Sequence, residues 1–209
     1  MGFLFLDIES FIDPLEPGSG LNPYFEKSKI IVIAFNYYSN QIAPEGEQIK
    51  PPTFLFEWVE GSEKKLLEKF YSELKQICEK DAFLKIVGFN QLAYDLNYLF
   101  GRLKYHKIDS EKELFDKLFT KPRHIDLAQL GMAVSRSTKR DSDFRTISQK
   151  TINSYYNIPL KEASGKDVSI FYLKKEYEKI VKYCQEEFTF ELLYQSLLQT
   201  FLHETKTTT

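Results

Sequence analysis

Two carboxylates near the N-terminus are spaced so that they could bind a metal ion together. Asp7 and Glu9 interrupt an apolar run that begins at Phe3. Side chains alternate between the two faces of a β-strand, so residues two apart lie on the same face. Two carboxylates on one face of an apolar strand repel each other and are costly to desolvate, and a shared divalent cation removes that conflict. The pair could also lie at the solvent-exposed end of a strand without any ligand.

A third carboxylate follows a strand in the middle of the chain. The strand predicted over residues 84–89 ends at Asn90, and after a short turn Asp95 falls in the first turn of the next predicted helix. The helix dipole stabilises a negative charge there, and the carboxylate can face the strand ends. A purely electrostatic role at the helix terminus remains the alternative.

Near the C-terminus, Tyr183 and Glu187 form a pair at helical spacing. Residues four apart in a helix share a face, so a phenol and a carboxylate could reach one site together. Pairs of this kind also occur on helix surfaces without any function.

The elements that must position these residues alternate between strands and helices. Apolar, β-branched runs predict strands over residues 2–8, 29–38, 53–59 and 84–89. Helical periodicity and end signals predict helices over 63–79, 93–104, 110–119 and 125–134, further helix from 144 with an interruption at 158–166, and a last helix over 175–203. This alternation predicts an α/β layer fold.

Length and composition predict one globular domain. The chain has 209 residues, of which 43% are hydrophobic and 28% charged, enough to bury a sizeable core. We expect a single domain over residues 1–203 and a polar tail over 204–209. The net charge of −2 argues against a protein that coats nucleic acid by bulk electrostatics. It does not exclude an enzyme that grips a short strand end.

The sequence also predicts a cellular location. Cys78 and Cys184 have neither metal-ligand nor disulfide-framework spacing, so a cytoplasmic protein is expected. The apolar runs are too short to cross a membrane, and the N-terminus goes directly into a strand pattern without the layout of a signal peptide. No membrane partner is therefore expected, and the oligomeric state is not indicated.

In their order along the chain, the three motifs resemble those of the DEDD superfamily of 3′–5′ exonucleases. The resemblance is to the subgroup with tyrosine in the third motif, which includes the exonuclease domain of family B DNA polymerases. The segment Gly-Phe-Asn-Gln-Leu-Ala-Tyr-Asp that ends at Asp95 is similar to that group's Gly-Tyr-Asn-x-x-x-Phe-Asp, and Ile-Asp-Leu after His124 resembles the element that follows it. The resemblance spans nearly the whole chain.

This resemblance implies an RNase H-like fold, with a central mixed sheet of about five strands flanked by helices. It implies a stand-alone exonuclease that removes nucleotides from the 3′ end of single-stranded DNA, with two Mg²⁺ or Mn²⁺ ions as cofactors. Asp7 would bridge both ions, Glu9 and Glu187 would complete the shell of one, and Asp95 would support the other. Tyr183 would orient the attacking water.

Several further residues are candidates for contact with the nucleic acid. Asn90 would contact the strand or position the metal-bearing turn. Phe11, Phe89 and Tyr94 could stack on terminal bases or belong to the core, and Lys166 could contact phosphate. The basic group Lys139, Arg140 and Arg145 could steer phosphates or form an ordinary solvated loop. His124 is expected to be structural, and Asp126 could support the site from behind.

One departure from the family pattern leaves alternatives open. The last acid of the family is usually Asp, whereas Glu187 carries an additional methylene group, and Glu186 would point about 100° away on a helix. Catalytic placement finer than about 1 Å matters in such sites. The alternatives are therefore an active exonuclease, a nucleic-acid-binding or accessory module that has lost turnover, and a ribonuclease, since the motifs do not report the sugar.

Overall fold

The computed structural model describes residues 1–13, 22–39, 50–138, 147–160 and 163–206, and of these only the backbone is described for 135–138 and 203–206. The candidate phosphate-steering residues Lys139, Arg140 and Arg145 lie outside these ranges.

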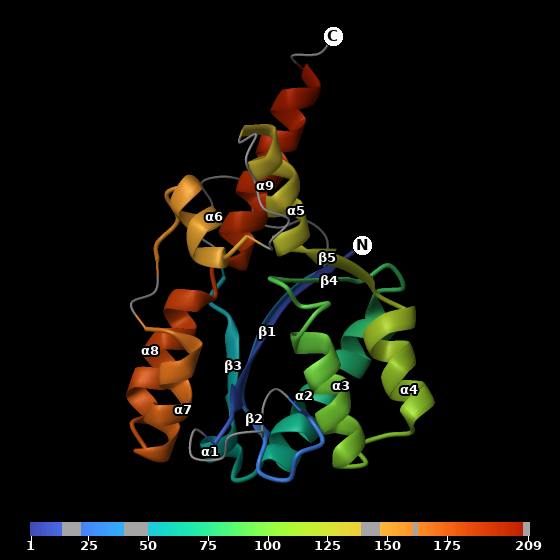
Figure 1. Ribbon diagram of the computed structural model, residues 1–209. Coiled ribbons are helices and arrows are strands. Elements are labelled where there is room, and N and C mark those ends of the chain that lie inside the picture. The colour runs from blue at the N-terminus through green and yellow to red at the C-terminus, as the bar shows by residue number, and fades with distance from the viewer. Residues whose placement is uncertain (14–21, 40–49, 139–146, 161–162, 207–209) are drawn as a thin grey trace.

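The chain has an RNase H-like α/β fold built on a five-stranded mixed sheet, as predicted (Figure 1). The strand order is β3-β2-β1-β4-β5, in which β1 pairs antiparallel with β2 and parallel with β4, and β5 pairs parallel with β4. The strands are β1 (Phe3–Phe11), β2 (Lys29–Tyr38), β3 (Thr53–Phe56), β4 (Lys85–Gly88) and β5 (Arg123–Asp126).

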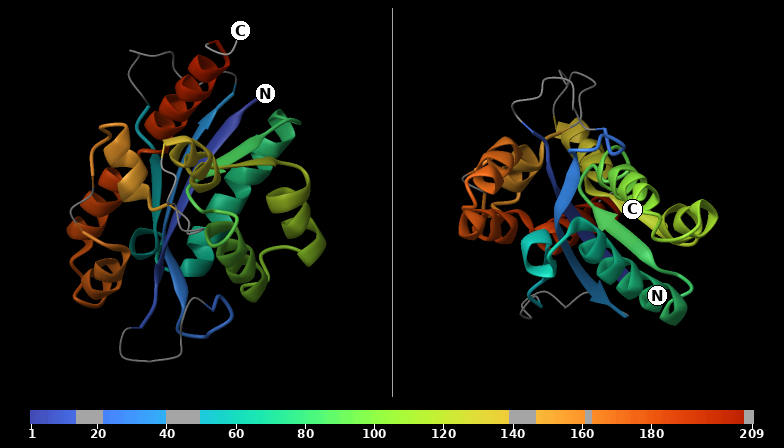
Figure 2. Two further views of the ribbon diagram at one scale, coloured as in Figure 1. Left: turned by 45° about the horizontal axis from the view of Figure 1, so that its top comes forward. Right: turned by 90° about the horizontal axis from the view of Figure 1, so that it is seen from below.

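Helices cover both faces of this sheet (Figure 2). Ser62 accepts a hydrogen bond from the Lys65 N–H and so caps the start of α2. The helices are α1 (Glu57–Glu60), α2 (Glu63–Lys80), α3 (Asp95–Tyr105), α4 (Glu111–Phe115) running on into the π-helical turn η1 (Asp116–Thr120), α5 (Leu127–Thr138), α6 (Gln149–Tyr155), α7 (Gly165–Leu173), α8 (Tyr177–Glu187) and α9 (Phe190–Lys206). None of them, over the residues the structure describes, is long and apolar enough to cross a membrane.

Alternation along β1 sorts its side chains between two layers. Leu4, Leu6 and Ile8 pack into a core with residues of α2 and α3. Phe3 and Phe5 face the other way, into a second core formed with α5, α6 and α9. Phe11 lies in a third core formed with α7 and α8. Asp7 and Glu9 therefore lie between the last two cores, at the place on β1 where neither core supplies an apolar residue.

A buried ion pair links α3 to α2, and through α2 to the sheet. Arg102 of α3 donates from Nε to Oε1 of Glu63 at 2.8 Å, and both side chains are almost fully buried. The Glu63 carboxylate also accepts the Ile30 N–H of β2 at 2.7 Å. These bonds satisfy both charges and fix the helix that begins with Asp95.

Several predicted boundaries were wrong. β1 runs to Phe11, beyond the predicted end at residue 8, and α5 runs to Thr138, beyond the predicted end at residue 134. The strand β5 replaces the start of the helix predicted over 125–134, because its backbone pairs with β4 although its sequence, Arg-His-Ile-Asp, lacks an apolar run. β3 ends at Phe56, where α1 begins. The single last helix predicted over 175–203 is two helices, α8 and α9, separated at Phe188 and Thr189, and α9 extends into the predicted tail.

Candidate active site

Three carboxylates converge beside β1. Asp7, Glu9 and Glu187 each offer a carboxylate oxygen, and these oxygens all lie within 4.8 Å of one another. Asp7 and Glu9 share a face of β1, as their spacing predicts, and Glu187 reaches them from the last residue of α8. The side chains are half-buried, so their charges repel through a medium less polar than bulk water.

Asp95 lies beside this cluster at the first residue of α3. The Ile8 N–H of β1 donates to its Oδ1 at 3.4 Å, and the side chain is buried. Burial raises the pKa of the Asp95 carboxyl above its ordinary value, and the nearby charges of Glu187 and Asp126 raise the pKa further, against the hydrogen bonds from backbone N–H groups. Loss of solvation is thus the main cost of ionising this group.

All four carboxylates line one open cavity of about 640 Å³. The cavity lies between β1, the turn before α3, the start of α6 and the end of α8. Among the residues that the structure describes, the rest of the wall is formed by Ile8, Phe89, Asn90, Ala93, Tyr94, Ile147, Ser148, Gln149, Gly165, Tyr183 and Phe190. It is large enough for a nucleotide-sized group and several waters.

The turn that carries Asn90 and Asp95 is held from behind by Asp126 at the end of β5. Its buried carboxylate accepts the backbone N–H groups of Asn90 at 2.9 Å and Leu92 at 3.2 Å. Asn90 has φ of 57°, in the left-handed region that asparagine tolerates better than most residues. Asp126 therefore supports the turn and does not itself line the cavity walls described above.

Tyr183 is buried next to the carboxylate cluster. Its side chain is 3% exposed, and its hydroxyl bonds to the Glu187 carboxylate. Burial, followed by the charges of Glu9, Glu187 and Asp7, raises the pKa of this phenol far above its ordinary value of 10.0. The hydroxyl therefore stays protonated and acts as a hydrogen-bond donor.

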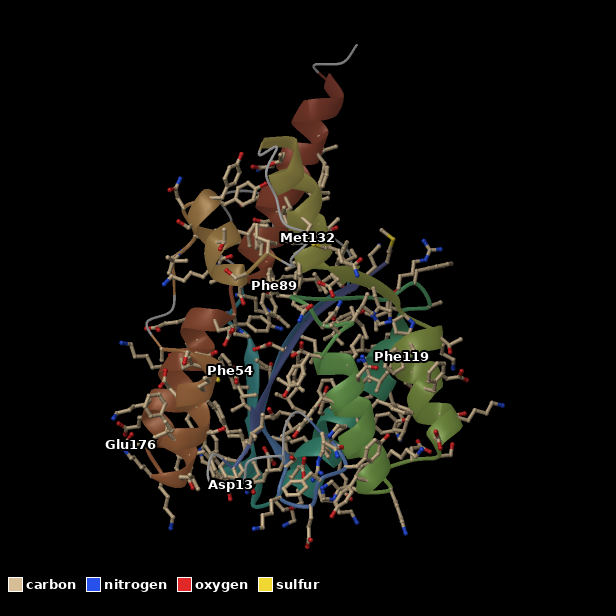
Figure 3. The ribbon with its side chains drawn as sticks, viewed as in Figure 1. Asp13, Phe54, Phe89, Phe119, Met132 and Glu176 are labelled. Carbon is tan, nitrogen blue, oxygen red and sulfur yellow. The ribbon has the colours of Figure 1, made fainter. Side chains whose placement is uncertain are left out.

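The candidate nucleic-acid contacts divide into two groups. Asn90, Phe89 and Tyr94 line the cavity, and Phe89 is labelled in Figure 3 at the end of β4. Phe11 is not among the described residues that line the cavity. It is 7% exposed, and its ring packs against that of Tyr172 with the centroids 5.2 Å apart, so it is a core residue. Lys166 is exposed at the start of α7 and is not among the described residues that form the cavity wall.

One predicted structural residue lies away from the cavity, and two residues that were not predicted line it. His124 packs near the ring of Phe119, with centroids 6.2 Å apart, and burial lowers the pKa of its imidazole. It is absent from the part of the cavity wall that the structure describes. Gln149 and Gly165 do line the cavity, although the sequence analysis did not identify them. Gln149 follows Ser148, which caps α6, and that capping signal was the only local hint.

Comparisons with solved structures support the fold. A family B DNA polymerase from the archaeon Pyrobaculum calidifontis superposes with a TM-score of 0.63 at 15% identity, over 96% of this chain and 25% of the polymerase. Exonuclease I in complex with an inhibitor gives 0.51 at 12% identity over 84% of this chain and 42% of that one. Its product-bound form gives 0.50 at 13% identity, over 78% and 40%.

These structures are similar to the chain in fold. No protein-family model matches the sequence, and no curated protein matches it. The chain spans about a quarter of the polymerase and about two fifths of exonuclease I. It therefore has the fold of one part of each of these larger proteins.

Proposed function

We propose that this protein is a metal-dependent 3′–5′ exonuclease that removes nucleotides from the 3′ end of single-stranded DNA. The observation that carries the proposal is the convergence of carboxylate oxygens from Asp7, Glu9 and Glu187 within 4.8 Å. Asp95 lies on the same cavity. The similarity in fold to exonuclease I is consistent with this activity. The direction of digestion comes from the resemblance of the three motifs, and the preference for DNA comes from the subgroup that they resemble, which includes the exonuclease domain of family B DNA polymerases.

The donor set fits hard divalent cations. Carboxylate oxygens are the ligands preferred by Mg²⁺ and Mn²⁺, and a cation relieves the repulsion between three clustered carboxylates. Asp7, Glu9 and Glu187 would hold one ion, and Asp95 with Asp7 would hold a second. When bound, two such ions supply a water of lowered pKa and stabilise the charge that develops on the leaving oxygen.

The chain's own groups position the substrate and the water. The phenol of Tyr183 remains neutral and donates to Glu187, so its oxygen is available to accept a hydrogen bond from the attacking water, and its role would be to orient that water. Asn90, Phe89 and Tyr94 border the same cavity, where the two aromatic rings offer surfaces for a terminal base and the amide offers hydrogen bonds. The side chain of Tyr94 is held by a hydrogen bond between its hydroxyl and that of Ser10.

The position of Glu187 favours an enzyme over a binding module that has lost turnover. The Glu187 carboxylate lies close to those of both Asp7 and Glu9. Such a cluster is unfavourable without a cation because the charges repel, so its presence favours a protein that uses the metal site. Neither Cys78 nor Cys184 forms a disulfide in the part of the chain that the structure describes, which is compatible with the cytoplasmic location that we propose for this enzyme.

A digestion assay tests the proposal. Single-stranded DNA and RNA of one sequence, labelled at the 5′ end, are incubated with Mg²⁺, Mn²⁺ or EDTA. We expect a ladder of DNA that shortens from the 3′ end in metal, and no shortening in EDTA or with Asp7→Asn. Asp116→Asn, in η1 on the other face of the sheet, is the matched control and should stay active.

The assay also separates the alternatives. A retarded but unshortened band with wild-type protein would support the binding module. Faster shortening of RNA than of DNA would support the ribonuclease. Release of label as a mononucleotide from the 5′ end at the earliest times would overturn the proposed direction.

A further inference from the structure

The helix that carries Glu187 ends in a tight turn directly after that residue. Phe188 has φ of −75° and ψ of 68°, the conformation of the central residue of an inverse γ-turn. In agreement, the Thr189 N–H donates to the Glu187 carbonyl at 2.7 Å. The turn ends α8, and α9 starts at Phe190.

Helix α6 fastens this turn with two amide side chains. Gln149 donates from Nε2 to the Glu187 carbonyl at 3.0 Å. Asn153 donates from Nδ2 to Oγ1 of Thr189, also at 3.0 Å, and its side chain is buried. The two amides are four residues apart and therefore share one face of α6.

We propose that Gln149 is a positioning residue for Glu187, and that Asn153 holds the turn against which Gln149 acts. The last carbonyls of a helix have no intrahelical partner, and helix ends fray. The Glu187 carbonyl accepts the Thr189 N–H within the turn, and Gln149 supplies a second donor that ties this carbonyl to α6. The backbone at Glu187 sets the direction of a side chain that must meet Asp7 and Glu9 within 4.8 Å. The hydrogen bond from α6 holds the Glu187 carbonyl in place, and the backbone position in turn limits where the Glu187 carboxylate can lie.

The extra methylene of Glu187 makes this support more important. A Glu side chain has one more rotatable bond than Asp, so it depends more on a fixed backbone to place its oxygens. Gln149 reaches the helix end from the wall of the same cavity. The inference rests on the proposed function, because it assigns the support of a proposed metal ligand.

Metal binding without nucleic acid tests this role. Gln149→Met removes the donor and keeps the length of the side chain, and Gln76→Met makes the same change on the exposed surface of α2. Calorimetry with Mn²⁺ is expected to show affinity weakened roughly 10-fold in Gln149→Met, the scale of a lost supporting bond behind a metal ligand. Gln76→Met should match wild type.

A double-mutant cycle shows whether the effect runs through Glu187. In the Glu187→Gln background, Gln149→Met should cause no further loss of Mn²⁺ affinity. An equal, additive loss in that background would overturn the inference, and so would wild-type affinity in Gln149→Met. Because nucleic acid is absent, a direct contact between Gln149 and substrate cannot produce the expected result.

The failure of the two proposals can be distinguished. If wild-type protein binds no Mn²⁺, the proposed function fails. If wild type binds Mn²⁺ and Gln149→Met binds it equally well, only the positioning role fails. Melting curves in EDTA establish that each variant is folded, and Gln149→Ala, which also lacks the donor, replaces Gln149→Met should the latter not fold.

Discussion

The backbone N–H of Ile8 donates a hydrogen bond to the Asp95 carboxylate at 3.4 Å. Ile8 stands between Asp7 and Glu9 in β1, so this bond ties the first residue of α3 to the strand that carries the other two carboxylates. Its own side chain points into the core on the opposite face. β1 thus supplies Asp7 and Glu9 on one face and the backbone N–H that binds Asp95. The side chain of Ile8 holds this part of the strand in the core.

Replacing one acid should stabilise the metal-free protein while abolishing its response to metal. Glu9→Gln removes one charge from three carboxylates that lie within 4.8 Å, and relief of repulsion should raise the melting temperature in EDTA by roughly 2–4 °C, about 1 kcal/mol. The further rise that Mn²⁺ gives wild type by binding the folded state should be lost. Thermal melts with and without Mn²⁺ measure both effects.

The matched control for that variant is Glu79→Gln on the exposed end of α2. It should melt as wild type in both conditions. A lower melting temperature of Glu9→Gln in EDTA would contradict the account, because it would mean that the carboxylate stabilises the metal-free fold.

Shortening the last acid should lower activity. Glu187→Asp matches the usual family residue, but it draws the carboxylate back by one methylene from the oxygens of Asp7 and Glu9, which Glu187 meets within 4.8 Å. A misplacement of about 1 Å can cost roughly 100-fold in rate, so we expect a loss of roughly 10- to 100-fold in kcat. A gain in activity would show instead that the natural site is detuned.

The phenol of Tyr183 should matter for turnover more than for metal binding. Tyr183→Phe removes only the hydroxyl that bonds to Glu187. The rate of digestion at saturating substrate should fall by roughly 100-fold, as expected for a lost group that orients the reacting water. Mn²⁺ affinity, measured by calorimetry, should change by less than roughly 3-fold. Tyr155→Phe, at an exposed tyrosine, is the control, and equal losses in rate and affinity would refute a water-orienting role.

Support of the turn by Asp126 should also be measurable. Asp126→Asn replaces one carboxylate oxygen by an NH2 group, which cannot accept a hydrogen bond, so the N–H of either Asn90 or Leu92 loses its acceptor. We expect a loss of about 1–3 kcal/mol in the free energy of unfolding and a fall in kcat of roughly 10- to 100-fold through displacement of Asp95. Urea denaturation and digestion rates measure the two effects, and wild-type activity in the variant would exclude the role.

A buried acid away from the carboxylate cluster should make stability depend on pH. Burial raises the pKa of Glu191 to about 7 from 4.5, against hydrogen bonds from Tyr38 and Asn36. Between these values the folded state binds the proton more tightly than the unfolded state, so the free energy of unfolding falls as pH rises. The contribution is fully present below about pH 4.5, is lost as the pH passes 7, and amounts to about 1–3 kcal/mol.

Glu191→Gln should flatten this part of the pH profile, because the amide stays neutral at every pH. Urea denaturation at intervals from pH 4.5 to 8 measures the difference between variant and wild type. Glu178→Gln, on the exposed face of α8, is the control and should keep the wild-type profile. A stability difference between Glu191→Gln and wild type that does not change with pH would contradict the expectation.

The sequence predicted the parts of the site that depend on local periodicity. Alternation along β1 placed Asp7 and Glu9 together, and the strand-to-helix turn placed Asp95 at the start of α3. The motif resemblance joined these to Glu187, and the structure brings its oxygens to the first two acids. Local spacing alone could not do so, because it does not say which face of a distant helix meets the sheet.

What was missed depends on pairing and packing between distant segments. β5 exists because β4 offers it a parallel partner, and its four residues carry no strand pattern of their own. The break between α8 and α9 had a signal, since Thr189 directly before Phe190 is a favoured helix cap, but the apolar periodicity continued across it. For Phe11 the sequence left base stacking and a core position open, and the structure places it in the third core.

Diffraction from crystals soaked in Mn²⁺ tests the central claim most directly, because the anomalous signal locates the ions without assumptions about activity. The account predicts one Mn²⁺ bound by oxygens of Asp7, Glu9 and Glu187, and a second next to Asp95 when a short DNA strand is present. The absence of an anomalous peak at these carboxylates, or Mn²⁺ bound only at other sites, would contradict the proposed metal site.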